Sequence, residues 1–166
     1  GKQGGLGGPG VVGYDLTVEN NGTISGGLTG AASHAAAILF FAGENTLFIQ
    51  NGSVMNGLVL ANGNDDLLTY ALYTAGAVSV DLFLDEATGT SGIQGFERYT
   101  GSASDADTMT LDGQSSGYEF VLATGGGFLI TDIDLSNGDL GTITVKDFEF
   151  FAFDDITLTA ASLINS

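Results

Sequence analysis

The chain of 166 residues contains no cysteine and no tryptophan, one proline (Pro9) and one histidine (His34). Without cysteine, disulfide bonds contribute nothing to its stability. A single histidine rules out a histidine-based metal cluster and a histidine-dependent catalytic triad. The scarce proline contrasts with 27 glycines, and this combination fits many tight corners within a regular β-rich fold. No Gly-X-Y period is present, so a collagen-like repeat is excluded.

Basic residues are also scarce. Lys2, Arg98 and Lys146 face 20 acids, which gives a formal net charge of −17. Three scattered bases cannot form a basic patch, so nucleic acid binding is excluded, and anionic membrane surfaces would repel the chain. Carboxylates spread over a structured chain indicate divalent cations, a salty medium or solubility through mutual repulsion.

No apolar run approaches the roughly 18 residues of a membrane span, so membrane insertion is not expected. No signal peptide is visible, and the chain is interpreted as a mature form, a fragment or a substrate of a C-terminally read secretion route. Hydrophobic residues make up 43% of the chain, enough for one domain with a real core. We expect a glycine-rich arm or linker over residues 1–13 and a single β-domain over residues 14–166.

The stretch from Ala37 to Tyr70 carries the clearest pattern, because short apolar runs alternate with polar corners. Such runs are too short for helices and suit strands. The corners contain Asn-Gly pairs, and both residues tolerate the positive φ that sharp corners need. Repetition of strand and corner predicts a stack of hairpins or the windings of a β-solenoid. Further strands are expected along the chain, among them 53–60, 118–122, 128–133 and 147–153.

Residues 16–70 resemble the passenger repeats of bacterial autotransporter adhesins. The matching text is ENNGTISGG (19–27) followed by AILFFAGENTLFIQNGSVMNGLVLANGNDDLLTY (37–70). The resemblance implies a right-handed parallel β-helix. We therefore expect an all-β fold, a right-handed parallel β-solenoid, with a two-sheet β-sandwich as the alternative.

Residues 80–160 resemble the spacer regions of secreted RTX-type calcium proteins, in the segments VDLFLDEATGTSGIQGFERYTGSASDADTMTLDG (80–113) and DLSNGDLGTITVKDFEFFAFDD (134–155). The glycine-rich nonapeptide of that family occurs once and in altered form, LANGNDDLL (60–68). One altered copy cannot form the usual ladder of calcium ions. The resemblance therefore supports the fold more than it supports calcium binding.

Two acidic turns are candidate calcium sites, because calcium prefers hard oxygen ligands. One is formed by Asn64, Asp65 and Asp66; the alternative interpretation is a solvated turn that caps its own backbone. The other is formed by Asp105 and Asp107, which are expected to lie on one side if their segment is extended. Calcium is the only cofactor expected, and no catalytic residues are identified.

Three other patterns have plain structural interpretations. Acid pairs could act in glycoside hydrolysis, but such pairs are inevitable among 20 acids, and the protein is not expected to be an enzyme. Asn21-Gly22-Thr23 and Asn51-Gly52-Ser53 match the glycosylation sequon and also suit turns. The aromatic run at 148–153 is expected to lie in the core or in a subunit contact.

These features predict an extracellular structural or adhesive module of a bacterial surface or matrix protein, which self-assembles into homo-oligomers or filaments. One alternative is a domain that binds or cleaves carbohydrate, with cell-surface glycans as partners. Another is a calcium-stabilised secretion module.

Overall fold

The computed structural model describes residues 7–29, 33–82, 92–134 and 140–164. Within these residues the fold is all-β, which confirms the predicted class. Helical structure there is confined to one 3₁₀ turn, η2 (Ser115–Gly117), and one short helix, α1 (Ala160–Ile164).

The strands form four sheets. The first has the order β1 (Val11–Gly13), β4 (Ile38–Phe40), β7 (Val59–Ala61), β10 (Ile93–Gln94). The second has seven strands in the order β13 (Tyr118–Leu122), β14 (Phe128–Asp132), β15 (Thr142–Lys146), β11 (Arg98–Thr100), β8 (Leu67–Thr69), β5 (Thr46–Ile49), β2 (Thr17–Asn20). The third has the order β17 (Thr157–Thr159), β16 (Phe150–Ala152), β12 (Thr108–Thr110), β9 (Ser79–Asp81), and the fourth pairs β3 (Thr23–Ser25) with β6 (Val54–Asn56).

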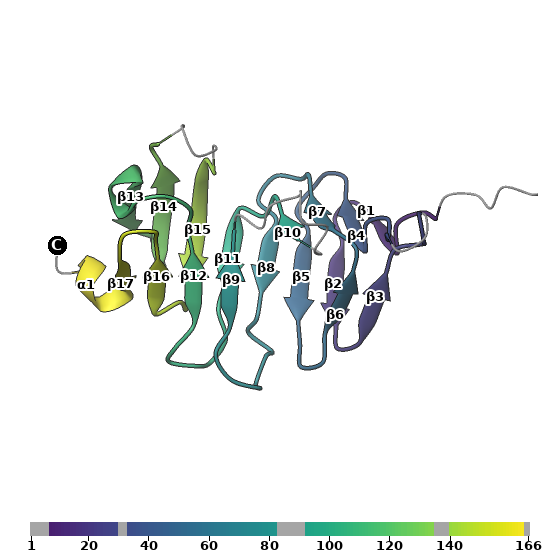
Figure 1. The fold of residues 1–166 in the computed structure, drawn as a ribbon, viewed down its shortest axis with the longest axis horizontal. Helices are drawn as coiled ribbons and strands as arrows, with labels where there is room; N and C mark the ends of the chain where they lie inside the picture. The colour runs from purple at the N-terminus through teal and green to yellow at the C-terminus, as the bar shows by residue number, and fades with distance from the viewer. Residues whose placement is uncertain (1–6, 30–32, 83–91, 135–139, 165–166) are drawn as a thin grey trace, which may run out of the picture.

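The chain passes through these sheets in a repeated order. We call the strand triplets β1–β3, β4–β6, β7–β9 and β10–β12 the first to fourth windings. In the first two sheets, the strands of each winding pair in parallel with the strands of the next winding. In the third sheet β9 pairs in parallel with β12, and in the fourth sheet β3 pairs in parallel with β6. Figure 1 shows the strands side by side along the long axis, from the purple N-terminal strands to the yellow C-terminal ones.

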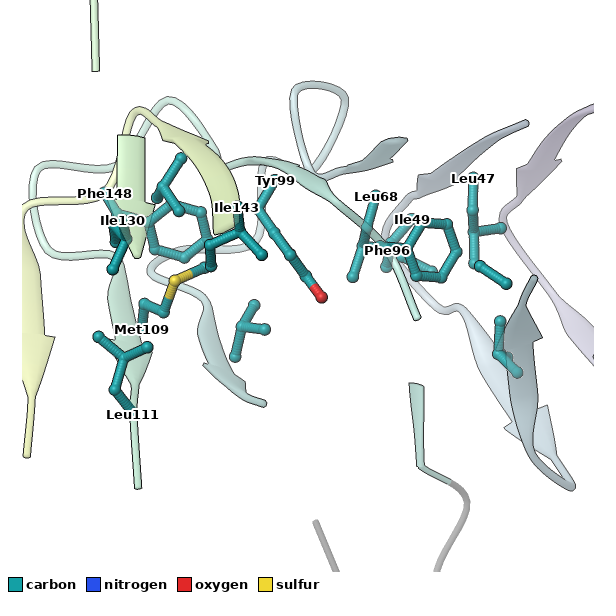
Figure 2. Packing of buried hydrophobic residues seen from close by; sticks show 14 of the residues in the cluster. Leu47, Ile49, Leu68, Phe96, Tyr99, Met109, Leu111, Ile130, Ile143 and Phe148 are labelled. Carbon is teal, nitrogen blue, oxygen red and sulfur yellow. The ribbon is translucent and has the colours of Figure 1, made fainter. Parts of the chain in front are cut away.

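Because the register is parallel, equivalent residues of neighbouring strands lie beside one another and form rows of buried side chains. In the seven-stranded sheet the row is Leu47, Leu68, Tyr99 and Val145, all of them buried. Val80, Met109 and Phe151 form a second buried row in the third sheet. These rows belong to one continuous hydrophobic core, part of which Figure 2 shows. Alternate residues of each short strand therefore fill the interior, as the period of two requires.

The C-terminal end departs from parallel pairing. β14 is antiparallel to both β13 and β15, and β17 is antiparallel to β16. Edge-on aromatic contacts fill this end, with ring centroids 5.3 Å apart for Phe120 and Phe151 and 5.6 Å apart for Phe128 and Phe151. We call residues 118–134 and 140–164 the C-terminal cap. The sequence analysis did not predict such a cap.

Three further expectations need correction. Residues 7–13 do not form part of the arm predicted over residues 1–13, because β1 begins at Val11 and the Gly7 N–H donates to the Leu28 carbonyl at 3.0 Å; residues 1–6 lie outside the described part. The strand expected over 53–60 is two strands, β6 and β7, divided at Gly57, where φ is +116°. The strand expected over 147–153 is β16 alone, because the backbone turns at Asp147 with φ of +56°.

Candidate functional site

Side-chain oxygens join neighbouring windings at the corner that leads into the seven-stranded sheet. Asn45, Asp66 and Glu97 each directly precede a strand, and we call them the first corner row. Asn45 Oδ1 accepts the Leu16 N–H at 2.9 Å, Asp66 Oδ1 accepts the Asn45 N–H at 2.8 Å, and Glu97 Oε2 accepts the Asp66 N–H at 2.7 Å. Each side chain thus binds the backbone one winding earlier, which fixes the register between windings.

The same arrangement recurs before the strands of the third sheet. Asp107 Oδ1 accepts the Val78 N–H at 2.8 Å, and Glu149 Oε2 accepts the Asp107 N–H at 2.9 Å. We call Asp107 and Glu149 the second corner row. In both rows, the aspartate is followed by a glutamate before the next paired strand, and this glutamate accepts the backbone N–H of the aspartate.

The two aspartates of these rows are completely buried, with 0% of their surface exposed. Asp66 also accepts from Asn45 Nδ2 at 2.8 Å and from the Gly63 N–H at 3.0 Å. Asp107 also accepts from the Ser102 N–H and, at 3.0 Å, from the Ser102 hydroxyl. Because a buried carboxylate without partners is costly, these hydrogen bonds are what allow the two side chains to sit inside the fold.

The structure separates the five residues predicted to bind calcium. Asp66 and Asp107 are buried and bound to backbone N–H groups, whereas Asn64, Asp65 and Asp105 are exposed. Arg98 Nε lies 2.7 Å from Asp65 Oδ1, so this aspartate has a cationic partner. Within the described residues, no three histidine or acidic side chains gather in a group that could hold a metal ion.

Asp105 lines an open hollow of about 360 Å³ beyond the ends of β8, β11 and β15. Asp147 and Glu149 line it too, together with Ser102 and Ser104. Of the predicted calcium ligands, only Asp105 lies here. Asp147 and Glu149, which line this hollow with Asp105, were not among the predicted calcium ligands.

Burial perturbs three titratable groups, of which Tyr99 is buried and Glu97 and Tyr70 are half-buried. It raises the pKa of the Glu97 carboxyl; the hydrogen bond from the Asp66 N–H opposes this rise, and the negative charge of Asp66 adds to it. Burial raises the pKa of Tyr70 to about 12, and it also raises the pKa of Tyr99. Both phenols therefore remain protonated at neutral pH, and Figure 2 shows Tyr99 among the buried side chains of the core.

The first winding presents a different surface. Val11, Leu16, Val18 and Ile24 pack against the core but are only half-buried. Val11 and Val18 pair in register with Ile38 and Leu47, which are completely buried. β1, β2 and β3 are also edge strands of their sheets. We call these three edges and four side chains the N-terminal face.

Two aromatic side chains lie exposed at one corner of the first two windings. Tyr14 follows β1 and is 68% exposed, and Phe41 follows β4 and is 57% exposed. The Phe41 N–H donates to the Gly13 carbonyl at 2.8 Å, which places the two residues on adjacent windings. Large apolar side chains exposed together often mark a binding surface.

Comparisons with protein-family models, curated proteins and solved structures find no match to this chain. In the described part of the chain, no helix has the length and apolar character needed to cross a membrane. The corner rows were missed by the sequence analysis at Asn45, Glu97 and Glu149. A signal was present, because each of these polar residues stands directly before a strand and two positions before a buried apolar or aromatic side chain, Leu47, Tyr99 or Phe151.

Proposed function

We propose that the protein is a right-handed parallel β-solenoid that serves as an extracellular structural or adhesive module of a bacterial surface or matrix protein, and that copies join end to end through the N-terminal face. Three observations support the solenoid: the repeated strand order, the parallel register between windings and the buried rows along the long axis. A rod of this kind holds its ends a fixed distance apart.

The half-buried side chains of the N-terminal face carry the proposal of assembly. A solenoid buries its core between successive windings, so a first winding without a neighbour leaves its interior side chains and strand edges exposed. The C-terminal end is closed by antiparallel strands and a helix, while the described residues include no such cover over Val11, Leu16, Val18 and Ile24. A second copy placed on this face would bury them and pair the strand edges.

The net charge of −17 opposes contact between copies. Repulsion among exposed charges is screened by salt, with a Debye length of about 8 Å at physiological ionic strength. Assembly is therefore expected to strengthen with ionic strength and with calcium.

Light scattering on the purified chain tests this proposal, since a monomer has a mass of 16.9 kDa. We expect a larger mass in millimolar calcium and a return to the monomer for Val18→Asp, which places a charge in the N-terminal face. Val12→Asp is the matched control, because Val12 lies in the same winding and is 48% exposed on the outer side of β1. Thermal unfolding of both variants checks that each is folded. A monomeric intact chain at high concentration would contradict assembly.

A second candidate function, carbohydrate binding, is favoured by Tyr14 and Phe41. Exposed aromatic rings on adjacent windings offer apolar faces on which sugar rings can stack, and cell-surface glycans would be the partners. A glycan array with the intact chain and with Tyr14→Ala tests this. Leu72→Ala is the control, because Leu72 is also exposed but is not part of the pair. Equal glycan binding by both variants would show that the aromatic pair is not the glycan-binding surface.

A further inference from the structure

The same short sequence pattern occurs at the same corner of two adjacent windings. Asn21-Gly22-Thr23 connects β2 to β3, and Asn51-Gly52-Ser53 lies between β5 and β6. The two corners are neighbours, since the Val54 N–H donates to the Gly22 carbonyl at 2.7 Å. Asn-X-Ser/Thr is the acceptor pattern for asparagine-linked glycans. The pattern does not distinguish the two asparagines, but the structure does.

The Asn51 side chain is also exposed, but it is hydrogen-bonded to the third winding. Its Nδ2 donates to the Thr74 hydroxyl at 2.7 Å, and its Oδ1 accepts from the Thr74 N–H at 3.0 Å and from the Ala75 N–H at 3.1 Å. Glycan transfer needs the amide nitrogen free in the active site of a transferase. In the folded protein, Asn51 can meet that need only if these three hydrogen bonds break.

Asn21 lies one winding nearer the end of the molecule. It is exposed, and among the described residues its side chain makes no hydrogen bond. The adjacent turn is held instead by Asn20, whose Oδ1 accepts the Gly22 N–H at 3.1 Å. Thr23, the hydroxyl residue of the pattern, is exposed as well. Because β2 and β3 are edge strands, this corner has a neighbouring corner on only one side.

We propose that Asn21 is an acceptor for an asparagine-linked glycan and that Asn51, in the folded protein, is not. The inference rests on the proposed export of the chain to a compartment where such transfer occurs. The donor is an oligosaccharide linked to a lipid through pyrophosphate. The Asn21 Nδ2 forms a bond to the anomeric carbon of the first sugar, and the bond from that carbon to the phosphate oxygen breaks. The lipid pyrophosphate leaves with the electron pair, and the amide proton passes to a base of the transferase.

The test uses the purified, folded full chain with an oligosaccharyltransferase that accepts Asn-X-Ser/Thr and its lipid-pyrophosphate donor. Intact mass spectrometry is expected to show the gain of one glycan, and this gain is expected to be lost in Asn21→Gln and in Thr23→Ala. Thr23→Ser, which keeps a hydroxyl, should retain the gain, and Asn51→Gln should leave it unchanged. Because the reaction is run on purified protein, it reports on the acceptor independently of where the chain is located in its cell.

A heat-unfolded sample supplies the second readout. Unfolding breaks the bonds to Thr74 and Ala75, so the unfolded chain should gain a second glycan that is lost in Asn51→Gln. Modification of Asn51 in the folded chain would overturn the proposal, as would an unmodified Asn21 in folded chains that circular dichroism shows to be intact. An unfolded chain that still gains only one glycan would show that the bonds of Asn51 do not decide the outcome.

Discussion

The substitution Asp107→Ala tests the assigned role of the second corner row. It removes the acceptor for the Val78 N–H and the Ser102 N–H, both of which are inside the fold. Each buried donor left without a partner costs about 1–3 kcal/mol. The expected loss is therefore about 2–6 kcal/mol, a large part of the roughly 5–15 kcal/mol by which a domain of this kind is stable.

The matched control is Asp105→Ala, two residues away and exposed. Surface substitutions without structural partners usually change stability by no more than about 0.5 kcal/mol. Urea unfolding of both variants and the parent, monitored by circular dichroism, gives the comparison if the slope of the transition stays the same. A loss below about 1 kcal/mol for Asp107→Ala would refute the reasoning, because it would mean that water or another group satisfies both N–H donors.

Four other predictions follow from the structure. Because burial raises the pKa of Glu97 above the ordinary value of a glutamate carboxyl, its contribution to stability should fall as pH rises through and above that ordinary value; Glu97→Gln, which keeps an oxygen acceptor, should remove this fall in a series of melts between pH 4 and 7. Gly57→Ala should destabilise strongly, since a Cβ there would lie 2.0 Å from the Ala35 carbonyl oxygen; Gly125→Ala, also at positive φ but in open space, should cost only about 1–3 kcal/mol in denaturant titrations. Calcium should raise the melting temperature, and less so in Asp105→Asn; an equal rise with sodium chloride of the same ionic strength would show that screening is the cause. Far-UV circular dichroism should give a β spectrum, and a helix content above roughly one fifth would contradict the fold.

Much of the strand pattern could be predicted from local sequence. Strands β13 and β14 were expected over 118–122 and 128–133 and are found at Tyr118–Leu122 and Phe128–Asp132. Period-two alternation and glycine-rich turns are sufficient there. The single strand expected over 53–60 was wrong, because nothing in the local pattern shows that the Gly57 backbone, just before β7, approaches the Ala35 carbonyl, just before β4 of the preceding winding.

The candidate site could be predicted only in part, because the same residue types serve opposite purposes. Asp65 and Asp66 are adjacent acids, yet one is exposed beside Arg98 and the other is buried under backbone donors. Which of the two faces inward depends on the positive φ of Asp65, at +68°. The antiparallel cap was also missed, although a local signal was present, because β13 and β14 are adjacent in the sequence and are joined by the glycine-rich residues 123–127.

Because the corner rows repeat the same contacts from winding to winding, the length of the molecule can change by the gain or loss of whole windings. Each winding offers backbone N–H groups at its corner and receives a side-chain oxygen from the winding that follows, as Asn45 and Asp66 do for the windings before them. A duplicated winding that keeps Asn, Asp or Glu directly before its strand would present the same groups to both neighbours. Insertion would then leave the cap and the first winding unaltered. Duplication or deletion of the coding segment for one winding would therefore lengthen or shorten such a protein without any sequence change at either end.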